Sequence, residues 1–191
     1  MTTVSEQAAR VLLVGRRPRV LDELGRALRS VGMHVREETD VDRVRSGIDG
    51  STVDVLALGR AVPGSTRDGL VAALRARNPL VKVVDGLVPI TAILVAQVQE
   101  VLGTPAKDVR IVGGAAYEPA DSRFVLVMRR PAQVAVTLHR LDPIYRAHEE
   151  PIFTGRLDSG RQHLPVLRRI GRGERFLVVH ADTETTVHKI G

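Results

Sequence analysis

Four strand-like runs alternate with helix-forming segments in the first 102 residues, and this alternation constrains the fold more than any other feature. The runs cover residues 11–14, 33–39, 53–58 and 81–84, and the helical segments between and after them cover residues 18–31, 41–48, 67–77 and 90–102. Strands and helices that alternate at this spacing form a parallel sheet with right-handed crossovers. The sequence therefore predicts an α/β domain with a short, doubly wound parallel sheet of about four strands.

Individual residues support this reading of the first half. Val11–Val14 is a continuous apolar run, which is typical of a strand buried on both faces of a sheet. Pro18 follows it at a position that suits the first turn of a helix. The helical segment has one apolar stripe and is followed by Gly32, which predicts a left-handed helix stop.

The pattern changes after residue 103, where no convincing helical segment follows. Short β-type runs recur instead at residues 110–112, 123–128, 133–138, 152–153, 162–166, 174–180 and 185–190. Many short strands separated by turn residues favour an antiparallel sandwich. The predicted organisation is a leader (1–10), an α/β domain (11–103), a linker (104–108) and a small all-β antiparallel sandwich (109–191).

Composition excludes several classes of function. The chain has no cysteine, which removes disulfides, thiolate catalysis and cysteine-ligated zinc. No apolar run approaches the roughly 18–20 residues that span a bilayer, and the first ten residues lack the features of a secretory signal. These features predict a cytoplasmic protein with no membrane partner. The histidine spacings match no metal motif, so neither a metal site nor a cofactor is predicted.

Parallel sheets bind ligands at the carboxyl ends of their strands. In this chain the residues there are glycines, arginines and one acid, namely Gly15, Arg16, Arg17, Gly59, Arg60 and Asp85. A glycine next to an arginine lets backbone and guanidinium approach a phosphate together, and Asp85 could orient one of the arginines. Only the first glycine of a dinucleotide fingerprint is present. The alternative is that both glycines only permit tight turns and that the arginines are solvated.

Residues 11–102 resemble a response-regulator receiver, which has a flavodoxin-like fold. The resemblance covers residues 11–18, the strand after Gly32, residues 53–58 and the Val62-Pro63-Gly64 turn. In receivers, paired acids after the first strand hold magnesium, and an aspartate after the third strand accepts a phosphoryl group. Gly15 and Arg16 stand at the first position and Gly59 at the second. The resemblance therefore implies a receiver fold that lacks its phosphorylation chemistry and one βα unit.

The second half resembles the small Ig-like modules at the ends of secreted bacterial proteins and flagellar-hook capping proteins. The segments that carry this resemblance are residues 133–142, 155–164 and 174–189. Such modules bind or space other proteins, so the resemblance implies a contact role without chemistry.

These features favour a non-enzymatic regulatory protein that acts through protein–protein contacts, with a homodimer expected. The apolar face of residues 90–102 is wider than one packed face requires, which predicts an interface at Ile90, Ile93, Leu94 and Val98. One alternative is a sensor or enzyme that binds a nucleotide or anion at the strand ends. A second alternative, a nucleic-acid-associated accessory factor, is less favoured because aromatic residues make up only 3% of the chain.

Overall fold

The computed structural model describes residues 8–47, 49–87, 90–103, 110–141, 146–166 and 174–190. Contacts between Cα atoms divide the chain into two compact units, Met1–Leu102 and Gly103–Gly191. Most of the predicted leader and the whole predicted linker lie outside the described residues. Among the helices of the described residues, none combines the length and the apolar character needed to cross a bilayer.

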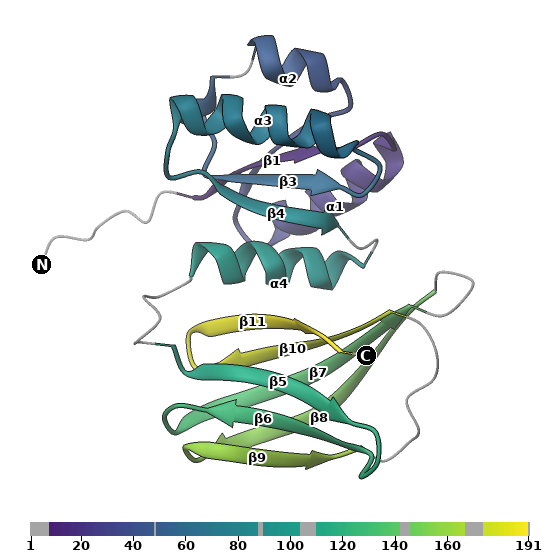
Figure 1. Cartoon of the computed structure of the whole chain (residues 1–191), viewed down its shortest axis with the longest axis vertical. Coiled ribbons are helices and arrows are strands. Elements are labelled where there is room, and N and C mark those ends of the chain that lie inside the picture. The colour runs from purple at the N-terminus through teal and green to yellow at the C-terminus, as the bar shows by residue number, and fades with distance from the viewer. Residues whose placement is uncertain are drawn as a thin grey trace, which may run out of the picture. The chain divides into compact units, whose positions relative to one another are not determined.

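The first unit contains one parallel sheet of four strands with helices on both faces, which confirms the predicted α/β fold (Figure 1). The strands lie in the order β2-β1-β3-β4. Their bounds are β1 Arg10–Val14, β2 His34–Glu38, β3 Val55–Gly59 and β4 Lys82–Leu87. The helices are α1 Pro18–Ser30, α2 Val41–Gly47, α3 Gly64–Arg77 and α4 Thr91–Leu102, with the short 3-10 helix η1 at Gly50–Thr52.

Strand β1 shows why the first unit needs a continuous apolar run. Val11 and Leu13 belong to the core that α1 and α4 cover, whereas Leu12 and Val14 belong to the core that α2 and α3 cover. All four side chains are almost fully buried. Because successive side chains of a strand point to opposite faces, only an uninterrupted apolar run fills both cores.

Helix α1 ends as the sequence predicts. Gly32 has a φ of +85°, in the left-handed region that favours glycine. Its N–H donates to the Arg29 carbonyl at 3.0 Å, and the Met33 N–H donates to the Leu28 carbonyl at 3.2 Å. These two bonds satisfy carbonyls of the last helical turn and aim the chain into β2.

Helix α4, together with Ile90 just before it, contains the four residues of the predicted interface. Leu94 and Val98 lie in the core that α4 shares with α1 and the sheet, and Ile90 and Ile93 are also buried. Leu94 and Val98 therefore serve the core of the first unit, and the predicted interface at Ile90 and Ile93 stays a prediction. The apolar face of α4 is wide because the helix packs against α1 as well as against β3 and β4.

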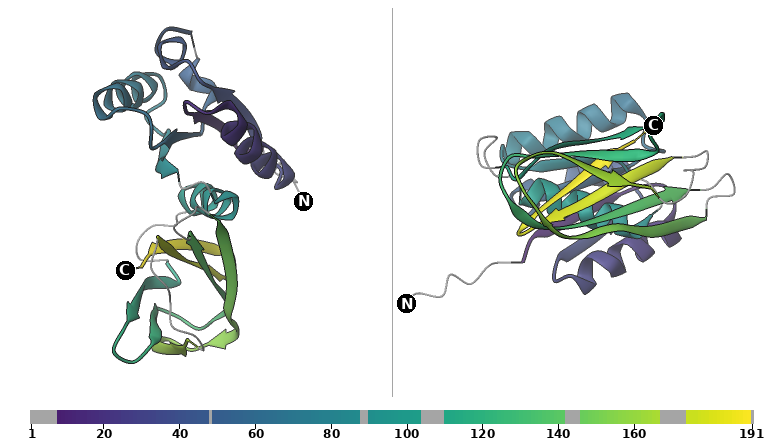
Figure 2. Two further views of the ribbon diagram at one scale, coloured as in Figure 1. Left: turned by 90° about the vertical axis from the view of Figure 1, so that its right-hand side faces the viewer. Right: turned by 90° about the horizontal axis from the view of Figure 1, so that it is seen from below.

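The second unit contains two antiparallel sheets, in the orders β11-β10-β7-β8 and β5-β6-β9. This confirms the predicted all-β architecture, and Figure 2 shows strands of both sheets around one interior. One apolar core, which includes Phe124, Leu138 and Leu177, receives side chains from both sheets. The strands are β5 Val112–Glu118, β6 Arg123–Met128, β7 Ala132–Leu141, β8 Ala147–Leu157, β9 Gly160–Pro165, β10 Arg175–Ala181 and β11 Glu184–Lys189.

The buried carboxylate of Glu184 joins the two sheets of this unit. Glu184, at the start of β11, is only 6% exposed, and its Oε2 accepts a hydrogen bond from the N–H of Ile111, just before β5. This hydrogen bond links β11, an edge strand of one sheet, to the residue just before β5, an edge strand of the other.

The pKa of His188, further along β11, is lowered by burial and also by the charge of Arg110, while the charge of Glu184 opposes the shift.

Two strands of the second unit are longer than predicted. β5 continues through Gly113, Gly114 and two alanines, residue types with weak strand preference that are held by pairing with β6. β8 has eleven residues, although only residues 152–153 were predicted as strand. Its Pro151 and its acidic residues hide the pattern, and such residues are tolerated because β8 is an edge strand.

Candidate functional site

The carboxyl ends of β1 and β3 meet at one edge of the parallel sheet, where the sequence places Gly15 and Gly59. A Cβ atom on Gly59 would lie 3.5 Å from the Gly15 Cα, so the two backbones are neighbours. That distance is an ordinary contact, and position 59 therefore has room for a Cβ atom. A Cβ atom on Gly15 would lie 3.2 Å from Leu21 Cδ2, which is tighter. Packing against Leu21 of α1 therefore favours glycine at position 15. At position 59 no comparably close contact favours glycine.

Three arginines follow these strand ends. Arg16, Arg17 and Arg60 are all exposed. Arg17 is the N-cap of α1; its carbonyl accepts hydrogen bonds from Val20 and Leu21, and no side chain caps the helix. The structure therefore brings the predicted glycines together and places the three arginines next to them. Whether this edge binds an anion stays a prediction.

Asp85 differs from the prediction. It lies inside β4, opposite Leu58 of β3, because β4 continues to Leu87 instead of ending at Val84. Its carboxylate forms an ion pair with Arg67 in the first part of α3. Arg67 was not among the predicted site residues, since only the register of β4 and the start of α3 at Gly64 bring the two together. Asp85 thus pairs with Arg67, and its predicted role toward Arg16, Arg17 or Arg60 stays a prediction.

Two further carboxylates near this edge accept hydrogen bonds from backbone N–H groups close to them in the sequence. Glu38, the last residue of β2, is buried, and its Oε1 accepts hydrogen bonds from the N–H groups of Thr39 and Asp40. Asp40 Oδ1 in turn accepts from Asp42 and Arg43 at the start of α2. Divalent cations need several oxygen ligands, and these oxygens already accept backbone hydrogen bonds. Within the described residues, no group of three acidic or histidine side chains is placed to hold a metal ion.

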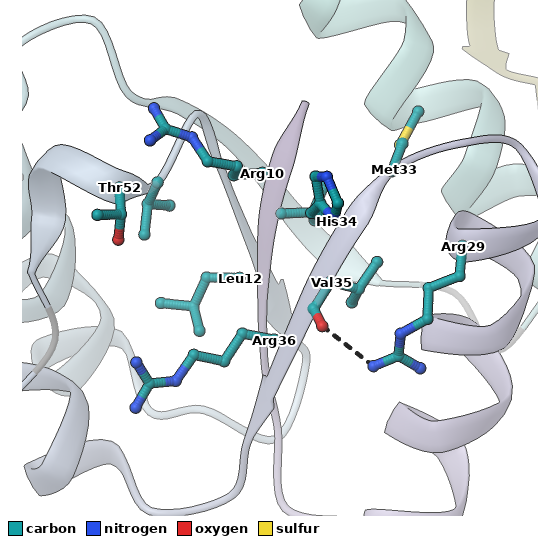
Figure 3. Close-up of a pocket in the computed structure, with 10 residues that line it drawn as sticks. Arg10, Leu12, Arg29, Met33, His34, Val35, Arg36 and Thr52 are labelled. Atoms are coloured by element: carbon teal, nitrogen blue, oxygen red, sulfur yellow. Dashed lines mark hydrogen bonds between the residues drawn. The ribbon is translucent and has the colours of Figure 1, made fainter. Parts of the chain in front are cut away.

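Hollows of the first unit lie at the opposite, amino end of the sheet. One of about 320 Å³ is lined by Arg10, Arg29, His34 and Arg36 with apolar neighbours, and another of about 610 Å³ lies near Asp54. Figure 3 shows that Arg10 and Arg36 lie on one side of the strands and Arg29 on the other. Sequence reasoning missed this end because the rule for parallel sheets directs attention to the carboxyl ends.

Two of the three arginines that line the smaller hollow, Arg10 and Arg29, form hydrogen bonds with other parts of the first unit. Arg10 donates two side-chain hydrogen bonds to Asp54, at 3.0 and 2.9 Å, and these bonds lower the pKa of the Asp54 carboxyl group. Arg29 donates to Glu37 at 2.7 Å and to the Val35 carbonyl at 3.1 Å. Because β2 is an edge strand, the second bond blocks part of an open strand edge. These contacts indicate a structural role for both arginines.

No protein-family model matches the sequence, and no curated protein matches it. The resemblance to receivers and to Ig-like modules stays a prediction from the sequence.

Proposed function

We propose that the protein is a non-catalytic regulatory protein that acts through protein–protein contacts, with a receiver-like first unit unable to accept a phosphoryl group. The strand order β2-β1-β3-β4 supports the receiver-like assignment, because it is the flavodoxin-like order without its fifth strand. The Ig-like second unit then supplies a further contact surface. The proposal keeps the cytoplasmic location expected from the sequence.

One observation carries this proposal: the sheet edge that would hold the chemistry is built from glycine and arginine. Gly59 stands where a phosphoryl acceptor would have to be, and it has no side chain. Gly15 and Arg16 stand where magnesium ligands would have to be, and an arginine cannot serve a hard cation that requires oxygen. The nearby carboxylate of Asp85 is paired with Arg67. Binding partners would therefore meet one constant surface that phosphorylation does not switch.

A magnesium titration of the full chain tests the proposal. We expect the backbone amide resonances of Gly15 and Gly59 to show no saturable shift with Mg²⁺, with or without beryllofluoride as a phosphoryl mimic. The Arg16→Asp/Gly59→Asp variant places two carboxylates at this edge, and a Cβ atom at position 59 makes only ordinary van der Waals contacts. This variant is expected to gain a saturable response to Mg²⁺.

The matched control is Ser30→Asp/Arg75→Asp, which adds two carboxylates at exposed positions on separate helices. Adding a carboxylate at each of two distant sites should give no saturable response. Saturable Mg²⁺ binding at Gly15 and Gly59 of the unmodified chain would contradict the absence of phosphorylation chemistry. A silent Arg16→Asp/Gly59→Asp variant would contradict the receiver-like geometry of the edge.

A further inference from the structure

Two arginines extend the inward-facing rows of the second unit beyond its apolar core. Along β7, Val134, Val136 and Leu138 belong to the core, and Arg140 is the next residue in that alternation. Along β10, Leu177 and Val179 belong to the core, and the next inward position toward the strand start is Arg175. Because strand side chains alternate with a period of two, both arginines face the interior at one end of the sandwich.

The register of the sheet places these two arginines side by side. Arg140 and Arg175 are directly opposite each other in the antiparallel pair β7–β10, and His148 of β8 is the partner of Arg140 on its other side. Like charges that face each other across strands are unfavourable. One row of the sheet thus carries two guanidinium groups with a histidine beside them.

Neither arginine has its charge balanced by the described part of the chain. The Nε atoms of both are buried without a hydrogen-bond partner, and no ion pair joins either guanidinium to a carboxylate of the described residues. The adjacent carboxylate of Glu174 accepts a hydrogen bond from Lys189 at 3.3 Å. A buried donor without an acceptor is costly, so native proteins rarely keep one without a reason.

We propose that Arg140 and Arg175 form a binding site for a phosphate-type oxyanion at this end of the second unit. A guanidinium group presents parallel N–H donors that match two oxygens of one anion. A carboxylate has only two oxygens and is matched by one such group, whereas a phosphoryl or sulfate group has enough oxygens to serve both. The bound anion would accept hydrogen bonds from both arginines and offset their mutual repulsion. Its source is either free phosphate or a phosphoryl group on another molecule.

Titration of the full chain with inorganic phosphate, at constant ionic strength set with chloride, tests this site. The Nε–Hε resonances of Arg140 and Arg175 are expected to move together and to saturate. Replacing either residue with methionine keeps a flexible apolar stem over the core and should weaken phosphate binding by about tenfold or more. Arg140→Lys keeps the charge without the paired donors, and we expect it to weaken binding as well.

The control is Arg130→Met/Arg156→Met, which removes two exposed arginines of the same unit and should leave phosphate binding unchanged. The melting temperature with and without phosphate gives a second measurement. Phosphate raises melting temperatures non-specifically, so the quantity that tests the site is how much more phosphate raises the melting temperature of the unmodified chain than that of Arg140→Met. Without phosphate, Arg140→Met is expected to melt no lower than the unmodified chain, because the repulsion between the two arginines is removed.

A peptide containing phosphoserine, titrated in parallel, identifies the source as a partner if it binds more tightly than free phosphate. Unsaturable shifts, or equal losses in the control, would overturn the site.

Discussion

The Leu94→Ala variant is expected to lose about 2–5 kcal/mol of unfolding free energy, the usual range for a buried leucine. Leu94 of α4 is fully buried and packs in one core with Leu13 of β1 and with Leu24 and Leu28 of α1. Truncation leaves a cavity that a core formed by a sheet and two helices fills poorly. Because Leu94 belongs to this core, the oligomeric state should not change.

Urea denaturation followed by circular dichroism measures the loss, and sedimentation velocity on the same samples measures the oligomeric state. Leu80→Ala is the matched control, because it removes the same atoms from a side chain that is 84% exposed. We expect the control to change the unfolding free energy by less than about 0.5 kcal/mol. If Leu94→Ala dissociated a dimer and left the stability of the chain intact, α4 would be an interface helix after all.

Replacing Phe124 with alanine is expected to cost about 3–5 kcal/mol in the second unit. Phe124 of β6 is fully buried in the core between the two sheets. Its ring centroid lies 5.3 Å from that of Tyr117, at a tilted angle that aromatic pairs favour. The variant therefore loses burial and an aromatic contact at once.

Amide resonances of both units, followed through a urea titration, show which unit the Phe124→Ala substitution destabilises. Val127→Ala, on the same strand, is the control because its side chain is 37% exposed. Phe124→Leu keeps most of the buried volume and should cost less than alanine does. If Phe124→Ala lowered the unfolding midpoint of the first unit as much as that of the second, the two cores would not be separate.

Much of the first unit could be predicted because its elements depend on local patterns. The apolar run at Val11–Val14, the proline that begins α1 and the glycine that ends it each act within a few residues. Strands β5 and β8 were underestimated because their stability comes from pairing with β6 and β7. A weak or polar pattern does not show such pairing in the sequence.

The candidate site could be predicted only in part, for the same reason. The neighbouring positions of Gly15 and Gly59 follow from the rule that parallel strands end at one edge. The pairing of Asp85 with Arg67 and the facing arginines Arg140 and Arg175 both depend on strand register. Register sets which residues of two paired strands face each other, and it is specified by the pattern and turns of both strands together.

Phosphoryl transfer to the full chain tests the central claim most directly. The measurement is the intact mass of the protein after incubation with acetyl phosphate and Mg²⁺, beside a phosphorylatable receiver as a positive control. Because Gly59 and Gly15 supply no carboxylate, the mass of this protein should stay unchanged while the control gains a phosphoryl group. Stable incorporation of one phosphoryl group, mapped to residues 1–102, would contradict the account.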